Sequence, residues 1–106
     1  MLNQVAQDIA VTVSDIIGHG VLVTDDRGII IGCDDASRIG VCHIPSLEVM
    51  KSRKPLVTTE AEASKMSGVK PGFTLPILLA EEVVGSIAIA GDPDEVKKFG
   101  VLVQKQ

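Results

Sequence analysis

The chain has 106 residues, of which 45% are hydrophobic and only 2% aromatic, and 14 acidic against 10 basic residues give it a net charge of −4. This length suits one domain that buries roughly 60–65% of its unfolded surface, so neither a metal ion nor a disulfide is needed for folding. The acidic balance and the lack of clustered cations beyond residues 51–54 argue against nucleic-acid contact by this domain, because phosphate neutralisation needs several cations together.

The N-terminus and the two cysteines indicate a cellular compartment. The first residues, MLNQVAQDIAVTVSDII, lack the cationic start and the small-residue cleavage pattern of a signal peptide. No apolar run reaches the length that spans a bilayer, and two cysteines without a disulfide framework suit a reducing environment. We therefore expect a cytoplasmic protein without membrane contact.

The first third of the chain predicts a helix followed by a hairpin. Residues 2–17 have the three-and-four spacing of a helix with one buried stripe, at Leu2, Val5, Ala6, Ile9, Val13, Ile16 and Ile17. Gly18 and Gly20 end this helix. Two β-rich runs, 21–24 and 29–31, then flank a turn in which Gly28 can take a positive φ.

The middle of the chain predicts a second helix over residues 45–53. Pro45 suits the first helical position, the basic residues at 51–54 suit the negative end of the helix dipole, and Pro55 stops the helix. The run LVTT at 56–59 predicts a short strand, and the polar segment 60–68 predicts a loop or a single helical turn.

The last third predicts another hairpin and a final helix. GFTLPILL (72–79) and VVGSIAIA (83–90) are β-branched apolar runs, and Pro76 implies an edge or a bulge in the first of them. Asp92 is a candidate N-cap of a helix that begins at Pro93 and carries Val96, Phe99 and apolar residues at 101–103. An apolar helix so near the chain end suggests a piece of a longer protein. The fold class is then α+β, with one antiparallel sheet flanked by the N- and C-terminal helices.

The loop GCDDASRIGVCHIPS (32–46) concentrates residue types that carry chemistry, but it matches no enzyme or metal motif. Cys33, Cys42 and His43 lack the paired C-x-x-C or H-x-x-H spacing of a metal site, and adjacent side chains in an extended segment point apart, which disfavours Cys42 and His43 as nucleophile and base. The acid pairs 25–26 and 34–35 are typical of turn residues and caps. No phosphate-binding loop is present in the sequence, and we expect no cofactor.

Two groups of donors could instead hold a small acid. Arg38 can clamp a carboxylate, Gly40 lets the backbone approach, and His43 and the amides near Pro45 and Ser46 add donors. A second group consists of Lys70, Gly72 and Thr74. The plain alternative is that Arg38 pairs with Asp34 or Asp35, that His43 is structural and that Lys70 is solvated.

The chain resembles the sugar diacid recognition domain at the N-terminus of bacterial carbohydrate diacid transcriptional regulators. The most specific matches are RIG followed by His43, the run GVKPGFTLPI at 68–77, and VGSIAIAGDPDEVKKFG at 84–100; only residues 51–67 match loosely. This resemblance implies a PAS- or GAF-like ligand-sensing domain over residues 1–106, ahead of a helix-turn-helix DNA-binding region that is absent from this sequence. It implies no catalysis.

The resemblance also suggests where a ligand would bind. Arg38, Gly40 and His43 match the family's first motif, and Lys70, Gly72, Leu75 and Pro76 match its second. Some members of the family have an amide residue at the position of Thr74 and often Arg at that of Lys70, so the preferred acid could differ. We expect Arg38, Gly40, His43, Lys70, Gly72, Thr74 and Leu75 to form a site for glucarate, galactarate, glycerate or a similar acid, with charge from Arg38, His43 and Lys70.

Two further expectations concern assembly and alternatives to sensing. The apolar stripe on residues 2–17 makes a homodimer plausible. The alternatives to a sensor are a ligand-free PAS-like dimerisation module and, less favoured, a small hydrolase or isomerase that uses His43 as a base.

Overall fold

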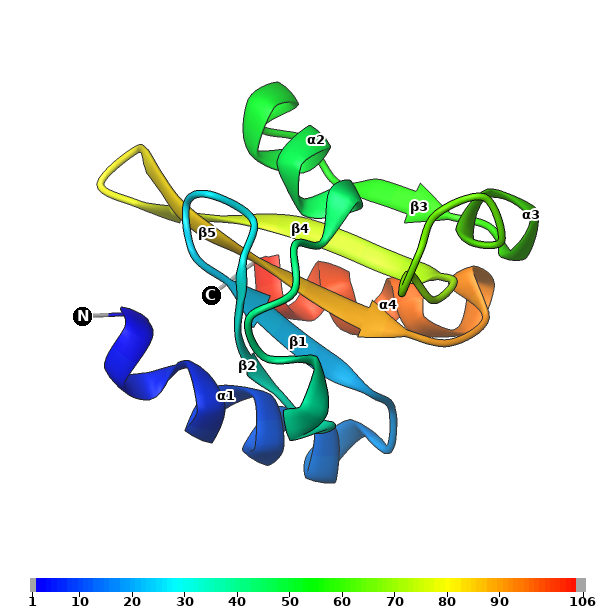
Figure 1. The fold of residues 1–106 in the computed structure, drawn as a ribbon, viewed down its shortest axis with the longest axis horizontal. Coiled ribbons are helices and arrows are strands. Elements are labelled where there is room, and N and C mark those ends of the chain that lie inside the picture. Colours follow the sequence, from blue (N-terminus) through cyan, green and yellow to red (C-terminus); the bar gives the residue numbers. More distant parts are fainter. Residues whose placement is uncertain (1, 105–106) are drawn as a thin grey trace.

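The computed structural model describes residues 2–104 of the chain, and the side chains of residues 2–100. Its elements follow the expected order of helices and strands (Figure 1). They are α1 (Leu2–Ile17), β1 (Val21–Thr24), β2 (Ile30–Cys33), the 3-10 helix η1 (Ala36–Arg38), α2 (Ile44–Ser52), β3 (Leu56–Thr58), α3 (Glu60–Ala63), β4 (Gly72–Leu79), β5 (Glu82–Ala90) and α4 (Pro93–Gln104).

The five strands form one antiparallel sheet in the order β2-β1-β5-β4-β3. Both predicted hairpins are confirmed, β1 with β2 and β4 with β5. The pairing of β1 with β5 joins the two halves of the chain at the centre of the sheet, with Val21 opposite Ile89 and Thr24 opposite Ser86. The α+β class with a central antiparallel sheet is therefore confirmed.

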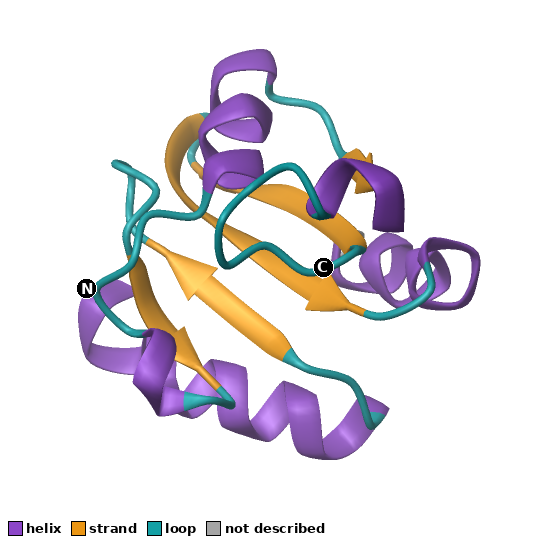
Figure 2. Ribbon diagram, turned by 45° about the vertical axis from the view of Figure 1, so that its right-hand side comes forward, coloured by secondary structure: helices purple, strands orange, loops and turns teal. Residues whose placement is uncertain are grey.

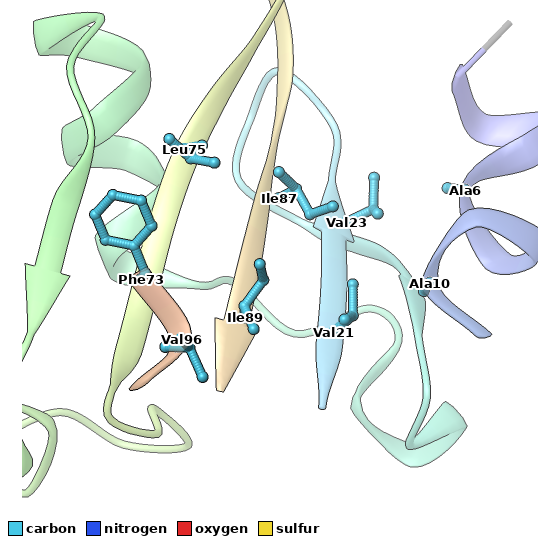
Figure 3. Packing of buried hydrophobic residues seen from close by; sticks show 9 residues of the cluster. All are labelled: Ala6, Ala10, Val21, Val23, Phe73, Leu75, Ile87, Ile89 and Val96. Carbon is cyan, nitrogen blue, oxygen red and sulfur yellow. The ribbon is translucent and has the colours of Figure 1, made fainter. Parts of the chain in front are cut away.

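The two faces of the sheet have different coverings, because side chains alternate along each strand. One face packs against α1 and α4 and forms the main apolar core (Figure 3), made of Ala6, Ala10, Val21, Val23, Phe73, Leu75, Ile87, Ile89 and Val96. We call it the α1/α4 face. The opposite face carries Leu22, Thr24, Thr74, Ser86 and Ala88, and α2 packs over β4 and β5 on this side. We call it the α2 face.

Local details agree with the residue patterns. Gly28 has a φ of 79° in the first hairpin turn, and the Asp94 amide donates to Asp92 Oδ1 at 2.9 Å, as expected of an N-cap. β3 pairs only with residues 72–74 of β4, so Pro76 lies where β4 has no strand on that side, which confirms its edge position. The apolar side chains expected at 101–103 lie outside the described side chains.

The edge strand β2 is held by α1 as well as by β1. The side-chain amide of Gln7 in α1 makes the two hydrogen bonds that a neighbouring strand would make with Cys33. Its Nε2 donates to the Cys33 carbonyl at 3.0 Å, and its Oε1 accepts from the Cys33 amide at 2.9 Å. None of the helices within residues 2–104 is both long and apolar enough to cross a membrane.

Candidate functional site

Arg38 links two loops that are distant in the sequence. It ends η1, whose N-cap Asp35 accepts a hydrogen bond from the Ser37 amide at 3.1 Å. The Arg38 guanidinium then reaches across to the segment between α3 and β4, where its Nη2 donates to the Gly68 carbonyl at 2.7 Å. That segment curves in front of the strands in Figure 2. Residues 34–43 and 64–71 are therefore joined side by side.

Lys70 belongs to the same neighbourhood. Hydrogen bonds from the Ser37 side chain and backbone lower the pKa of the Asp35 carboxyl, and the charges of Lys70 and Arg38 lower it further. Two cations from loops 30 residues apart in sequence thus act on one carboxylate. The Lys70 side chain is exposed and the Arg38 side chain is half-buried. The two basic groups lie on the same side of the molecule.

His43 is the N-cap residue of α2 and is only 4% exposed. Its Nδ1 lies 2.7 Å from the Ser46 hydroxyl oxygen. Burial, with a smaller effect from the charge of Arg38, lowers the pKa of His43 from 6.5 to about 4. The imidazole is therefore neutral near pH 7, and the expectation that it supplies positive charge is wrong; it offers a hydrogen bond instead.

The remaining predicted site residues have different roles. Thr74 is buried on the α2 face, in register with Ala88 of β5. Gly72 lies in the sheet between Thr58 and Ala90, and a Cβ at this position would overlap the Ile89 carbonyl. Its lack of a side chain thus serves strand packing.

Leu75 and Gly40 do not fit the expected site. Leu75 points to the α1/α4 face, is 2% exposed and belongs to the main core (Figure 3). The Gly40 amide donates to the Ile30 carbonyl at 2.9 Å, so it is already bonded and unavailable to an anion. The charge of Arg38 acts on His43, and Arg38 and Lys70 both act on Asp35, so Arg38, His43 and Lys70 are neighbours. Thr74 is buried on the α2 face, while Gly40, Gly72 and Leu75 act in the fold.

A buried chain of hydroxyl groups was missed by the sequence interpretation. Thr24 Oγ1 lies 2.7 Å from Ser86 Oγ, and the Ser86 hydroxyl donates to Ser46 Oγ at 2.6 Å, next to His43. Thr24, Ser46 and Ser86 are fully buried. The available signals were the i, i+3 spacing of His43 and Ser46 at a helix start and a lone serine in the apolar run VVGSIAIA.

The cysteines and acid pairs have structural surroundings. Cys33 is buried, which raises the pKa of its thiol, whereas Cys42 is exposed. Within residues 2–104, no three His, Cys, Asp or Glu side chains are grouped as metal ligands would be. Asp25 accepts from the Arg27 and Ile29 amides, and Asp35 accepts from Ser37, which confirms the predicted turn and cap roles for these two acids. Asp34 instead accepts from the Val21 amide of β1 at 2.9 Å.

Two hollows in the surface have positions that bear on the predicted site residues. One, of about 130 Å³, lies between α2, β3 and α3 on the α2 side, lined by Ile44, Pro45, Glu48, Leu56, Val57, Thr58, Glu62 and Met66. A larger apolar groove of about 500 Å³ lies between the start of α1 and the β4–β5 turn. Neither hollow is lined by Arg38, His43 or Lys70.

Comparison with known sequences places this geometry in context. A family model described as "Putative sugar diacid recognition" matches residues 1–106. The carbohydrate diacid regulator of Escherichia coli (strain K12) is 38% identical over 101 residues, which are 95% of this chain and 26% of that protein. This chain thus spans about a quarter of the length of the curated relatives it matches.

Solved structures with the same fold are sensor and cofactor-binding domains. The sensor domain of E. coli DcuS superposes with a TM-score of 0.64 at 19% identity and covers 92% of this chain and 75% of that one. The cofactor-binding GAF domain of the nutrient sensor CodY from Clostridium difficile gives 0.61 at 12% identity, covering 91% and 77% of the two chains. At such identities the likeness concerns the fold, and the expected GAF- and PAS-like architecture is confirmed.

Proposed function

The chain belongs to the sugar diacid recognition family, and from this we propose that it is the ligand-sensing domain of a cytoplasmic transcriptional regulator that binds a sugar diacid or hydroxy acid on its α2 face. The ligand class is supported by the name of the E. coli relative, a carbohydrate diacid regulator. In this proposal the domain binds its acid without turning it over, and it controls a DNA-binding region in the longer protein.

The observation that carries the proposal is the hydrogen bond from Arg38 Nη2 to the Gly68 carbonyl. It brings the guanidinium to the loop that carries Lys70, so the two cations can each take one carboxylate of a diacid. A ligand carboxylate is a stronger acceptor for a guanidinium than a neutral carbonyl, since charge-assisted hydrogen bonds are roughly twice as strong as neutral ones. We expect the ligand to replace Gly68 as the partner of Arg38.

His43 and Thr74 complete the proposed contacts. The neutral His43 imidazole donates one hydrogen bond, and the Thr74 hydroxyl either donates or accepts one. Asp35, which lies close to both cations, offsets their mutual repulsion in the free protein. In this proposal the loops at 34–43 and 64–71 separate to admit the acid. This movement is the signal that we propose is passed to the rest of the regulator.

A homodimer is the second part of the proposal. Val5, Val11 and Ile16 on α1 are 42%, 39% and 76% exposed, which leaves apolar surface for a second copy of the chain. The same observation supports the alternative function, a ligand-free dimerisation module, in which Arg38 keeps its bond to Gly68 and holds the loops closed permanently.

Thermal unfolding in the presence of aldaric acids, glycerate, simple dicarboxylates and neutral sugars tests the proposal. An acid present at about 100 times its Kd should stabilise the chain by roughly 2.7 kcal/mol. Arg38→Ala should abolish this stabilisation, whereas the matched control Arg27→Ala, an exposed arginine in the β1–β2 turn, should retain it.

Other outcomes favour other functions. Equal stabilisation by neutral sugars would contradict the carboxylate clamp. A stable dimer that responds to no acid would favour the interaction module, and consumption of an acid would favour an enzyme.

A further inference from the structure

The hydroxyl chain on the α2 face ends at the imidazole of the proposed site. It begins at Thr24 of β1, passes through Ser86 of β5 and Ser46 of α2, and reaches His43 Nδ1, with successive distances of 2.7, 2.6 and 2.7 Å. Distances of this size between oxygen and nitrogen atoms each require one proton. Because each hydroxyl has one proton to give, the direction of every bond in the chain is constrained.

The direction of the hydroxyl hydrogen bonds bears on the tautomer of His43. The Ser86 hydroxyl donates to Ser46, so its proton is not available to Thr24. The Thr24 hydroxyl, which also donates to the Asp25 carbonyl at 3.0 Å, then shares its proton with Ser86 across their 2.7 Å contact. Ser46 already accepts from Ser86, and in one of the two neutral tautomers of the ring its own proton goes to His43 Nδ1. Nδ1 is then the acceptor, and a neutral ring carries its proton on Nε2.

The other ring nitrogen is the one that solvent can reach. No described hydrogen bond uses His43 Nε2. Among the described residues, however, no fully enclosed side-chain nitrogen or oxygen lacks a partner. Nε2 is therefore not sealed within the protein, although the residue as a whole is only 4% exposed. A proton on Nε2 is then the one left for a water or a ligand oxygen to accept.

We propose that Thr24, Ser86 and Ser46 are positioning residues that hold His43 in the Nε2–H form, so that the site presents one fixed N–H donor to an oxygen of the bound acid. This inference rests on the proposed function for its ligand and on the hydrogen-bond geometry for its tautomer. A ring fixed in this form donates and does not accept at Nε2. It therefore selects a carboxylate or hydroxyl lone pair and rejects an ammonium or amide N–H at the same point.

Nitrogen-15 NMR of the free protein at pH 7.5 tests the tautomer without any ligand. We expect His43 to show a protonated Nε2 and an unprotonated Nδ1. Ser46→Ala should shift the ring to a mixture of tautomers, Ser86→Ala should have a smaller effect, and the matched control Ser52→Ala, an exposed serine on the same helix, should have none. A wild-type ring protonated on Nδ1 overturns the proposal, and that spectrum decides the question even if Ser46→Ala fails to fold.

Acid binding measured by calorimetry tests the link to the ligand. Ser46→Ala, which touches no ligand in the proposal, should weaken binding by about tenfold, the effect of about one hydrogen bond, and Ser52→Ala should leave it unchanged. Unchanged binding in Ser46→Ala overturns the positioning role. If wild type binds no acid, the proposed function fails, and the NMR result still decides the tautomer.

Discussion

His43 is held neutral in a buried position, and this makes stability depend on pH. Its pKa is about 4 in the folded chain against an ordinary value of 6.5, because burial penalises the charged ring. Between these two pH values the unfolded chain binds a proton that the folded chain rejects. The free energy of unfolding must therefore fall as the pH falls from 6.5 towards 4, by about 3 kcal/mol in total. Above pH 6.5 His43 is neutral in both states, so it causes no loss of stability there.

Urea unfolding at pH 7.5 and pH 4.5 measures this contribution. We expect the wild type to lose about 2 kcal/mol more stability between these pH values than His43→Gln, which has no ring to protonate. Hydrogen bonds from Ser37 lower the pKa of Asp35, and hydrogen bonds from Thr59 lower the pKa of Glu62. Both groups are the same in the two proteins, so their contributions to the pH dependence cancel in the comparison. An equal loss of stability in both proteins would show that the pKa of His43 is not lowered by folding and that the folded protein carries a charged His43 at pH 4.5.

At the scale of elements, α1 packs against β2 at a point where neither side has room for a side chain. A Cβ at Gly32 would overlap the carbonyl of Ala6, which is itself fully buried. The obstacle is helix backbone, so it cannot move away as the end of a side chain can. We expect Gly32→Ala to displace α1 and to lower the free energy of unfolding by about 2 kcal/mol, within the usual range for overpacking.

The matched control is Gly20→Ala, where the nearest atoms to an added Cβ are Asp34 Oδ1 at 3.4 Å and Ala90 Cβ at 3.5 Å, ordinary contacts. Urea unfolding should find Gly20→Ala within about 0.5 kcal/mol of wild type. If Gly32→Ala were equally harmless, α1 could not lie as closely on β2 as the structure places it.

For the whole molecule, the proposed ligand couples two loops that the sequence separates by 30 residues. Hydrogen–deuterium exchange with and without a binding acid tests this coupling. Exchange should slow in both 34–43 and 64–71 when the acid binds, because each loop supplies one cation, and Lys70→Ala should remove the effect from both segments together. Slowing in one loop alone would contradict a ligand shared between them.

Most of the local structure follows from short-range patterns. The spacing of apolar residues predicts α1, the turn residues before Gly28 predict the first hairpin, and Asp92 with Pro93 predicts the start of α4; all three are confirmed. These features depend on neighbours within about one helical turn or one hairpin, so the information lies in adjacent residues. The grouping of Arg38 with Lys70 came from chemistry and family resemblance, and the structure places both near Asp35.

The sequence by itself determined the aliphatic composition of the core and the order of the elements, and it predicted, without a test so far, which residues bind an acid. The tertiary structure alone decided that β1 lies between β2 and β5, and this pairing sets which face each side chain takes. The pairing of β4 with β5 directs the Leu75 side chain into the α1/α4 core. In the folded chain the Gly40 amide is bonded to the carbonyl of a strand residue, Ile30, and a hydrogen-bonded row connects Thr24, Ser86, Ser46 and His43. The physical reason is that strand pairing and burial join residues 40 to 62 positions apart, and both the face of a side chain and the pKa of His43 depend on those distant neighbours.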